Sequence, residues 1–171
     1  YLQDIQDTFE NLDSRVNRIW VENYPRMWRL RVSQNESAVK SASLKEQKSR
    51  WLSCLPAVRW VSRIPREEVR RFSSGIIEYD YGLMCLEEDA LALGFQKTPE
   101  VEIIPGGDYL ASMHRKTVRG PYTWEDIHYL TDYLQQEGIT LFGDTYSFIF
   151  ASRVEDGVEA NYHKLFCKIY S

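Results

Sequence analysis

Apolar residues recur every three or four positions along the first eighteen residues of the chain. Leu2, Ile5, Phe9 and Leu12 form a narrow stripe, and acidic residues and arginines occupy most of the other side. A stripe this narrow is typical of a coiled-coil seam, so residues 1–18 are predicted to be the end of a dimerisation helix. The alternative is an amphipathic helix that packs on its own domain. Because the stripe runs into the first residue, we favour dimerisation and expect a preceding segment.

The pattern changes to extended runs at residue 19. Residues 19–24 and 27–33 flank Pro25 and are predicted to form two extended runs around a turn, that is, a hairpin. A helix is predicted to begin at Ser43, where Ser43 and Glu46 match a capping box, and to end at Pro56. Its expected inner face consists of Leu44, Lys48, Trp51, Leu52 and Leu55. The next predicted elements are a strand over 58–64, a helical turn over 65–72, a strand over 76–85 and a helical turn over 86–94.

The second half of the chain repeats this order. A second hairpin is predicted from residues 101–104 and 109–116 around Pro105, and a helix capped by Thr123 and Asp126 follows, with Gly138 at its C-terminal cap position. The expected apolar face of this helix consists of Trp124, Ile127, Leu130, Thr131 and Leu134. Two more strands are predicted over 145–151 and 162–170, joined by a turn at Asp156-Gly157.

Two landmarks of the two halves share one offset. Pro25 and Pro105 are 80 residues apart, and so are the predicted helix caps Ser43 and Thr123. This agreement suggests an internal duplication. The sequence therefore predicts an α+β domain over residues 19–171, with two hairpin–helix–strand repeats at about 19–95 and 98–171 that form antiparallel sheets.

Composition narrows the class of protein. The chain has 171 residues, a formal net charge of −4 and an aromatic share of 13%. The acidic balance argues against a surface that binds nucleic acid through its phosphates. Tyrosine and tryptophan serve both in cores and in pockets for flat ligands, so the aromatic share leaves both uses open.

Cysteine and histidine give no sign of a metal or cofactor site. Cys54, Cys85 and Cys167 are odd in number and form no CxxC pair, which argues against a disulfide framework and a structural zinc site. The three histidines lack the spacing of metal ligands, so neither a metal nor a cofactor is expected. Since no run of about 18 apolar residues and no signal peptide is found, we expect a cytoplasmic protein without membrane contact.

Several segments of the second half resemble GyrI-like effector-binding domains. They are the run Val101-Glu102-Ile103-Ile104-Pro105-Gly106-Gly107-Asp108-Tyr109-Leu110-Ala111, then His114 followed by Gly120-Pro121-Tyr122, then Gly143-Asp144-Thr145-Tyr146, and the closing strand 162–169. The helix leading into this domain is similar to the arrangement in MerR-family multidrug-responsive transcription regulators. The resemblance implies two pseudo-symmetric SHS2-type repeats around a sheet-lined cavity for flat, lipophilic and often cationic compounds. It also implies a homodimer through the N-terminal helix, with DNA bound only by a domain preceding this chain.

In the family that the chain resembles, a buried glutamate meets the positive charge of the ligand. The corresponding residue here is Ser147, whose neutral hydroxyl cannot offset a buried cation. Glu78 and Asp80 are the closest candidates for a substitute carboxylate. The charge of the ligand is therefore left open.

The candidate ligand-binding residues are mostly aromatic. Period-two alternation places Tyr79 and Tyr81 on one side of a strand, which faces either a pocket or the core. Trp51 and Trp124 fit the inner faces of the two helices, so core packing is the alternative role for both. The full set of candidates is Trp51, Tyr79, Tyr81, Met113, Tyr122, Trp124, Tyr146, Ser147 and Tyr162.

The favoured function is a non-catalytic one: the small-molecule-sensing domain of a bacterial MerR-type transcription regulator. The alternative is a GyrI-like hydrolase that acts on small electrophilic xenobiotics. A general base needs a titratable group within reach, and Ser147 stands where the glutamate would be, which counts against the hydrolase. A free-standing protein-binding module is a third class, against which the N-terminal stripe argues.

Overall fold

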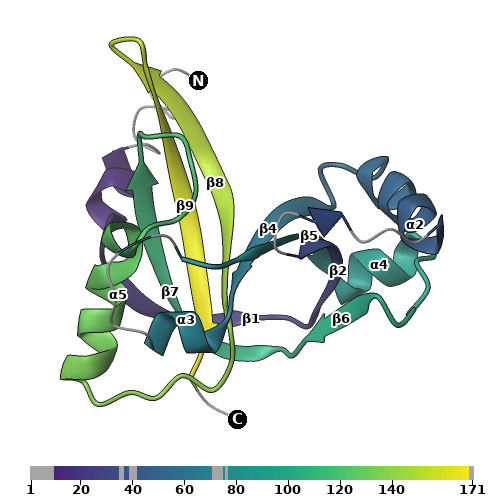
Figure 1. The fold of residues 1–171 in the computed structure, drawn as a ribbon, viewed down its shortest axis with the longest axis horizontal. Helices are drawn as coiled ribbons and strands as arrows, with labels where there is room; N and C mark the ends of the chain where they lie inside the picture. The colour runs from purple at the N-terminus through teal and green to yellow at the C-terminus, as the bar shows by residue number, and fades with distance from the viewer. Residues whose placement is uncertain (1–9, 35–36, 39–41, 71–74, 76, 170–171) are drawn as a thin grey trace.

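The computed structural model describes residues 10–34, 37–38, 42–70, 75 and 77–169. Over these residues the protein is an α+β fold in which short helices pack on a nine-stranded antiparallel sheet (Figure 1). The strands are β1 (Ile19–Tyr24), β2 (Met27–Gln34), β3 (Ser37–Ala38), β4 (Arg59–Ile64), β5 (Asp80–Leu86), β6 (Val101–Ile104), β7 (Gly107–Lys116), β8 (Thr145–Glu155) and β9 (Val158–Lys168). The helices are α2 (Ala42–Leu52), α3 (Arg66–Arg70), α4 (Glu87–Ala92) and α5 (Trp124–Gln136), preceded by a helical stretch at residues 10–15.

The two predicted hairpins do not form. Instead, the strands of the first predicted hairpin pair with those of the second. β1 pairs with β7 and β2 pairs with β6 in one continuous register, in which Tyr24 lies opposite Gly107 and Met27 opposite Ile104. A two-residue hairpin turn of type I′ needs positive φ at both central residues, and neither Pro25 nor Arg26 has it. The chain therefore bends at Pro25 and continues forward, as it does at Pro105.

The bend at Pro25 differs from the tight turn between β8 and β9. Asp156 and Gly157 have φ values of 50° and 77°, and there β8 and β9 do form the predicted hairpin. At the bend, the backbones approach closely, since a Cβ on Gly106 would lie 3.0 Å from the nitrogen of Arg26. The two bent strands thus pair with each other on both sides of the bend and connect the two ends of the strand order.

Two units with the same strand order make up the sheet. In one, β5 lies between β2 and β4, and in the other, β9 lies between β7 and β8. β4 pairs with β8 and so joins the units on one side, while the β1–β2 ladder with β6–β7 joins them on the other. Figure 1 shows α5 against β7 and β9 at one end, and α2 with α4 at the other.

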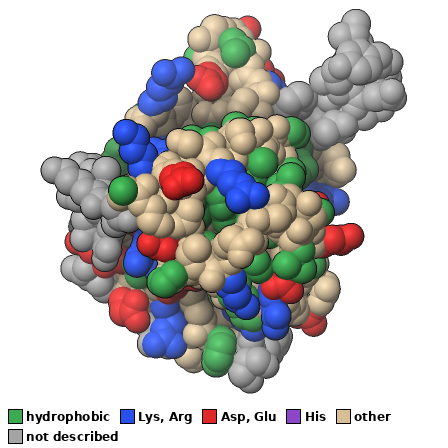
Figure 2. Space-filling view, turned by 90° about the vertical axis from the view of Figure 1, so that its right-hand side faces the viewer, with side chains coloured by type: hydrophobic (Ala, Val, Ile, Leu, Met, Phe, Trp, Pro, Cys, Tyr) green, Lys and Arg blue, Asp and Glu red, His purple; other side chains and the backbone are tan. Residues whose placement is uncertain are grey.

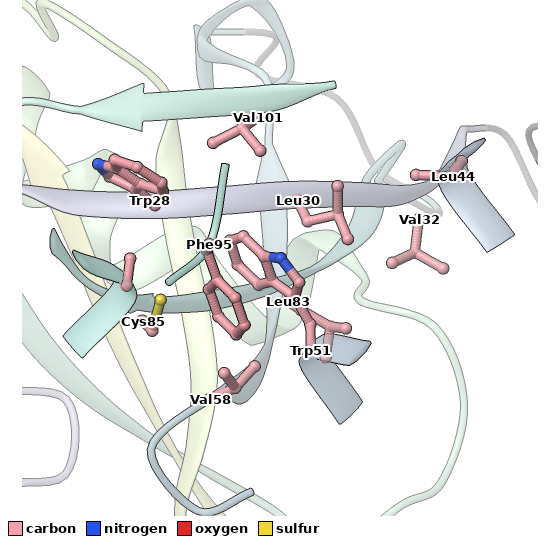
Figure 3. Close-up of a cluster of buried hydrophobic side chains, with 11 residues drawn as sticks. Trp28, Leu30, Val32, Leu44, Trp51, Val58, Leu83, Cys85, Phe95 and Val101 are labelled. Atoms are coloured by element: carbon pink, nitrogen blue, oxygen red, sulfur yellow. The ribbon is translucent and has the colours of Figure 1, made fainter. Parts of the chain in front are cut away.

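The core of the first unit lies between its sheet and the helices α2 and α4. Figure 3 shows Trp51 from α2 and Phe95 face to face against Leu30 and Leu83 of the strands. The two rings are 4.6 Å apart at an interplanar angle of 9°. Trp51 therefore takes the core role that was its alternative. Leu55, predicted on the same face, is 52% exposed because α2 ends at Leu52 and the chain turns away.

Helix α5 covers the second unit as its sequence predicts. Thr123 is its N-cap, the carboxylate of Asp126 accepts the backbone N–H of Thr123 at 2.8 Å, and Gly138 follows the C-cap with φ of 64°. Ile127, Leu130, Thr131 and Leu134 are buried along one face of the helix. The capping-box prediction for α5 is confirmed.

Several predicted boundaries are wrong, of which three bear on the site or on the N-terminal helix and α2. Ser43 lies inside α2, where its hydroxyl accepts a hydrogen bond from the Gln47 side chain at 3.1 Å, so it is not the cap. β5 begins at Asp80 rather than residue 76, because Ile77 donates its N–H to the carbonyl of Tyr122, away from the sheet ladder. The described part of the N-terminal helix ends at residue 15, since Val16 bridges to Met113 of β7.

The packing of this N-terminal helix corrects the prediction for Leu12. Its side chain is only 6% exposed and packs on Met113, Ala160 and Tyr162 of the same chain, so it does not lie in a dimer seam. The alternative, a helix packed on its own domain, applies to this part of the stripe. The other stripe residues, Leu2, Ile5 and Phe9, lie outside the described residues.

The surface carries both signs of charge. On the face shown in Figure 2, basic and acidic side chains are interspersed with apolar ones. Among the described residues, no helix is long and apolar enough to cross a membrane. Within that same part of the chain, no three His, Cys, Asp or Glu side chains are grouped so that they could hold a metal ion.

Candidate functional site

Strands β4 and β8 join the two units through a short ladder. Ser62 lies opposite Ser147, and Arg63 lies opposite Tyr146. Because side chains alternate between the two faces of a sheet, the serines point to one face, and Arg63 and Tyr146 point to the other. The junction therefore has a serine face and a charged face.

On the serine face, a cleft of about 120 Å³ opens, which we call the aromatic cleft. It is lined by Trp60, Val61, Ser62, Tyr79, Tyr81, Lys116, Gly120, Tyr122, Ser147, Phe148, Ile149 and His163. A cavity of roughly 150 Å³ holds one benzene ring, so about one aromatic ring fits inside. A larger flat ligand would extend over the rim.

The floor of the aromatic cleft is a chain of three hydrogen-bonded groups, the Tyr122 relay. The hydroxyl of Tyr122 lies 2.5 Å from the hydroxyl of Ser147 and 2.7 Å from Nδ1 of His163. Tyr122 and Ser147 are buried, and His163 is half-buried. These groups give the floor hydroxyl and imidazole atoms that can form directed hydrogen bonds.

Aromatic rings form the wall above this floor. Tyr79 stands edge-on to Tyr81 at 5.2 Å and to Tyr122 at 5.4 Å, and the hydroxyls of Tyr79 and Tyr81 are 3.3 Å apart. Trp60 and Tyr81 are 44% and 45% exposed, so their rings are available at the opening. Edge-to-face rings of this kind present flat apolar surfaces to a ligand.

Backbone contacts on both sides hold Tyr122 in place. The carbonyl of Tyr122 accepts the N–H of Ile77 at 3.0 Å, and the next residue but one, Trp124, donates its N–H to the carbonyl of Gly75 at 3.0 Å. Lys116 bonds the carbonyl of Pro121 at 3.3 Å and the carboxylate of Asp126 at 2.8 Å. The cap of α5 therefore fixes the residue that closes the cleft.

The Tyr122 relay is electrically neutral at neutral pH. Burial raises the pKa of Tyr122 above its usual value, so the phenol keeps its proton. Burial also lowers the pKa of His163 to about 4, with the charges of His114 and Lys116 acting in the same direction and Asp126 against it. The imidazole is thus uncharged, and its Nδ1 accepts or donates a hydrogen bond according to its tautomer.

The charged face holds a buried network of ion pairs. Arg29, fully buried, donates to Asp80 and to Glu102, the latter at 3.3 Å. Arg63 donates to the other oxygen of Asp80 from Nε at 2.8 Å and lies 3.5 Å from a carboxylate oxygen of Asp144. Burial lowers the pKa of Arg63, but attraction to these carboxylates outweighs it and raises the pKa overall.

A second opening lies beside the charged face. It is a cleft of about 300 Å³ lined by Tyr24, Met27, Pro56, Ala57, Arg59, Met84, Cys85, Leu86, Asp89 and Phe148. A cluster of buried side chains that includes Tyr109, Tyr146 and Phe166 borders both openings, since Phe148 belongs to this cluster and lines both clefts. The expected cavity between the halves is therefore two open clefts bordered by this packed cluster of bulky rings.

Four of the nine predicted ligand-binding residues meet in the aromatic cleft. They are Tyr79, Tyr81, Tyr122 and Ser147. Tyr146 points to the opposite face, where its hydroxyl donates to Glu102 at 3.2 Å. The remaining four lie away from the cleft: Trp51 in the first core, Met113 and Tyr162 against Leu12, and Trp124 half-buried in the first turn of α5.

Neither predicted charge partner reaches the aromatic cleft. Asp80 is 5% exposed and is taken up by Arg29 and Arg63. Glu78 is exposed, and its backbone N–H bonds the carboxylate of Glu68 at 3.2 Å. The assignment of Asp80 to a ligand's charge is wrong because the protein's own arginines occupy it.

Sequence reasoning missed the other eight lining residues, among them Trp60, Lys116 and His163. His163 follows Tyr162 in β9, and alternation along a strand places consecutive side chains on opposite faces. The pairing of β8 with β9 sets Ile149 opposite His163, and this cross-strand register was not readable from the sequence. Alternation along β9 could therefore have separated His163 from Tyr162, but the sequence does not give the register that brings His163 to the cleft.

Comparisons with known proteins add little to this geometry. No family model matches the chain, and no curated protein matches it. Among solved structures, the chain is similar to a hydrolase encoded by lin2189 from Listeria innocua, with 12% identity and a TM-score of 0.44 over 94% of this chain and 96% of that chain. A likeness this distant carries no information about activity.

Proposed function

We propose that this chain is a GyrI-like small-molecule-binding domain that acts as the sensing part of a MerR-type transcription regulator. The observation that carries the proposal is the aromatic cleft, whose rings and hydroxyl floor suit a flat ligand. Apolar contact with such rings is worth about 25 cal/mol per Å² of area removed from water. The relay would orient the polar edge of the ligand.

The register of the central ladder supports the duplicated plan that this family implies. If an offset of 80 residues relates the halves, the pair Tyr24–Gly107 should map onto the pair Ile104–Met27, which is also found. The equal strand orders of the two units agree with the same two-fold relation. Both observations favour two SHS2-type repeats packed as pseudo-symmetric halves.

Contacts between the N-terminal helix and the β8–β9 hairpin support the sensing role. Asp13 accepts hydrogen bonds from the hydroxyl of Tyr162 at 2.5 Å and from Arg153 at 2.7 Å. His163, the neighbour of Tyr162 along β9, belongs to the Tyr122 relay on the other face of the strand. A ligand that shifts β9 would therefore move the N-terminal helix. In this proposal that helix forms the dimer contact and connects the sensing domain to a DNA-binding domain on its N-terminal side.

Calorimetric titration with flat aromatic compounds tests the binding role. Tyr81→Ala removes an exposed wall of the cleft and should weaken binding by about tenfold, since it removes ring contact without disturbing the core. Phe142→Ala removes a ring outside the cleft that is 54% exposed, against 45% for Tyr81, and should leave binding unchanged. Equal affinities for the Tyr81→Ala variant and the unaltered chain would exclude the cleft as the site.

A hydrolase is the second candidate function, and one observation favours it. His163 supplies a titratable base next to the Tyr122 hydroxyl, which the sequence alone did not reveal. A pKa of about 4 makes this imidazole a weak base at neutral pH, so binding is the preferred function. Chromatography of the compounds after incubation separates the two: recovery of intact ligand supports sensing, and its conversion to a hydrolysis product supports the enzyme.

A further inference from the structure

Among the residues that the structure describes, those lining the aromatic cleft include no acidic side chain. Of its twelve described residues, Lys116 alone is charged at neutral pH, because His163 is held neutral by burial. Lys116 is compensated by the carboxylate of Asp126, to which it bonds at 2.8 Å. The described wall therefore offers a buried cation the faces of its aromatic rings but no carboxylate to neutralise its charge.

The nearest carboxylates are committed elsewhere. Asp80 lies on the charged face between two arginines. Asp126 accepts hydrogen bonds from Lys116 and from the N–H of Thr123, and Nε2 of His114 lies 3.2 Å from its carboxylate. Redirecting either of them to a ligand would take a carboxylate away from the arginine or lysine that it neutralises. A cationic guest would thus have to lose its hydration without an ionic partner.

The Tyr122 relay can present either a donor or an acceptor to a neutral guest. If Nδ1 of His163 accepts the proton of Tyr122, Ser147 donates to Tyr122 and its lone pairs face the cleft. If Nδ1 carries the proton instead, both bonds reverse, and the hydroxyl of Ser147 becomes free to donate. A change of tautomer therefore adapts the floor to a carbonyl or to a hydroxyl without any charge.

We propose that the aromatic cleft selects a neutral planar aromatic molecule whose carbonyl or hydroxyl group hydrogen-bonds Ser147, and that it discriminates against cations. This inference rests on the proposed function, and it names the class of ligand. One ring enters the cleft of about 120 Å³, and a second fused ring lies over the exposed faces of Trp60 and Tyr81. Neutral bicyclic phenols and ketones have this shape.

Three bicyclic probes of nearly equal size test the selection by calorimetry: 2-naphthol, naphthalene and N-methylquinolinium. 2-Naphthol should bind roughly tenfold or more tightly than N-methylquinolinium, because an uncompensated charge is costly to desolvate. It should also bind several-fold more tightly than naphthalene, because its hydroxyl completes the relay. Equal or tighter binding of N-methylquinolinium overturns the inference and leaves the proposed function standing.

Substitution at Ser147 provides the sharper test. Ser147→Glu places a carboxylate in the floor and should reverse the order of affinity for 2-naphthol and N-methylquinolinium. Glutamine has the size of glutamate but is neutral, so Ser147→Gln should keep the original order of affinity. Because position 147 is buried, the pair Trp60→Glu and Trp60→Gln repeats the comparison at the exposed rim without burying a charge. A cation preference that is the same in the Glu and Gln variants contradicts the inference.

Failure of the proposed function has a different signature. If none of the three probes binds the unaltered chain up to its solubility limit in water, the cleft is not a ligand site, and both the function and the inference fall. If 2-naphthol binds and Tyr81→Ala weakens it, the function holds, and the ratio of 2-naphthol to N-methylquinolinium affinity alone decides the inference.

Discussion

On the charged face of the β4–β8 junction, Arg29 and Arg63 share the carboxylate of Asp80, whereas on the serine face, Ser147 and His163 share the hydroxyl of Tyr122 without any formal charge. Both sets are buried or half-buried, and they meet at the β4–β8 ladder, where Arg63 lies opposite Tyr146, the neighbour of Ser147. A buried charge must keep its partner at all times, so the ionic groups cannot exchange their hydrogen bonds for contacts with a ligand. A neutral hydroxyl can exchange one hydrogen bond for another at low cost, and the neutral set is the one that borders an open cleft.

Asp80→Asn should produce the largest effect, because it leaves Arg29 buried with one carboxylate in place of two. Loss of a partner from a buried ion pair costs about 3–5 kcal/mol in the free energy of unfolding, which urea denaturation measures. The affinity of the aromatic cleft for 2-naphthol should change little, since Asp80 points to the other face.

Asp132→Asn is the surface control for this change. Asp132 pairs with His128 at 3.3 Å, and both side chains are more than half exposed, so its loss should leave the free energy of unfolding within error. The double variant Arg29→Met with Asp80→Asn should recover part of the stability, because the uncompensated charge is gone. A double variant less stable than Asp80→Asn alone would mean that packing, and not charge, dominates on this face.

Acidification should act on the serine face through His163. Its pKa lies at about 4 in the folded protein against an ordinary 6.5, and the groups that face it are His114, Lys116, Asp126 and Tyr122. The unfolded chain binds the proton more readily, so stability is complete above pH 6.5 and is lost as the pH falls towards 4, by on the order of 3 kcal/mol.

Denaturation curves between pH 7 and 4.5 measure this loss. His163→Gln should flatten the pH dependence, whereas His128→Gln, which removes an exposed histidine, should preserve it. Equal slopes for the unaltered chain and His163→Gln would show that the relay does not oppose protonation.

Gly82→Ala should act on the charged face by crowding. A Cβ at this position would lie 2.6 Å from the carbonyl oxygen of Leu30 and 3.0 Å from the Arg29 guanidinium carbon, so the guanidinium lies where a side chain would otherwise be. We expect a loss of about 1–3 kcal/mol in the free energy of unfolding. Gly143→Ala is the matched control, because its nearest contact is an ordinary 3.9 Å.

The α+β class and most elements were predictable, because they depend on local patterns. The strand β1 and the cap of α5 follow from alternation and from the Thr123–Asp126 spacing. The bends at Pro25 and Pro105 were mistaken for hairpins, since a proline followed by one residue marks a change of direction without saying which strand pairs with which. Only the φ values of the turn separate the two outcomes.

The candidate site was predictable in part for a similar reason. Ser147 and Tyr122 were identified through a resemblance, and Tyr79 and Tyr81 through alternation. Asp80 was misassigned because the sequence does not show that Arg29 and Arg63, at distances of 51 and 17 residues, converge on it. Long-range pairing of charges and cross-strand register are tertiary properties, and they decide which face each polar group serves.

Tyr122→Phe should produce the smallest loss of stability and so marks the contrast with Asp80→Asn. The phenylalanine keeps the ring against Tyr79 and removes only the hydroxyl that joins Ser147 to His163. A neutral hydrogen bond contributes about 1 kcal/mol net, and Ser147 and His163 lie at an open cleft where water can replace the missing hydroxyl. We therefore expect a loss of about 1–2 kcal/mol in urea denaturation together with a several-fold weaker affinity for 2-naphthol and an unchanged affinity for naphthalene. A loss as large as that of Asp80→Asn would show that the neutral relay exchanges its hydrogen bonds no more easily than the ionic network, and the functional distinction between the two faces would no longer hold.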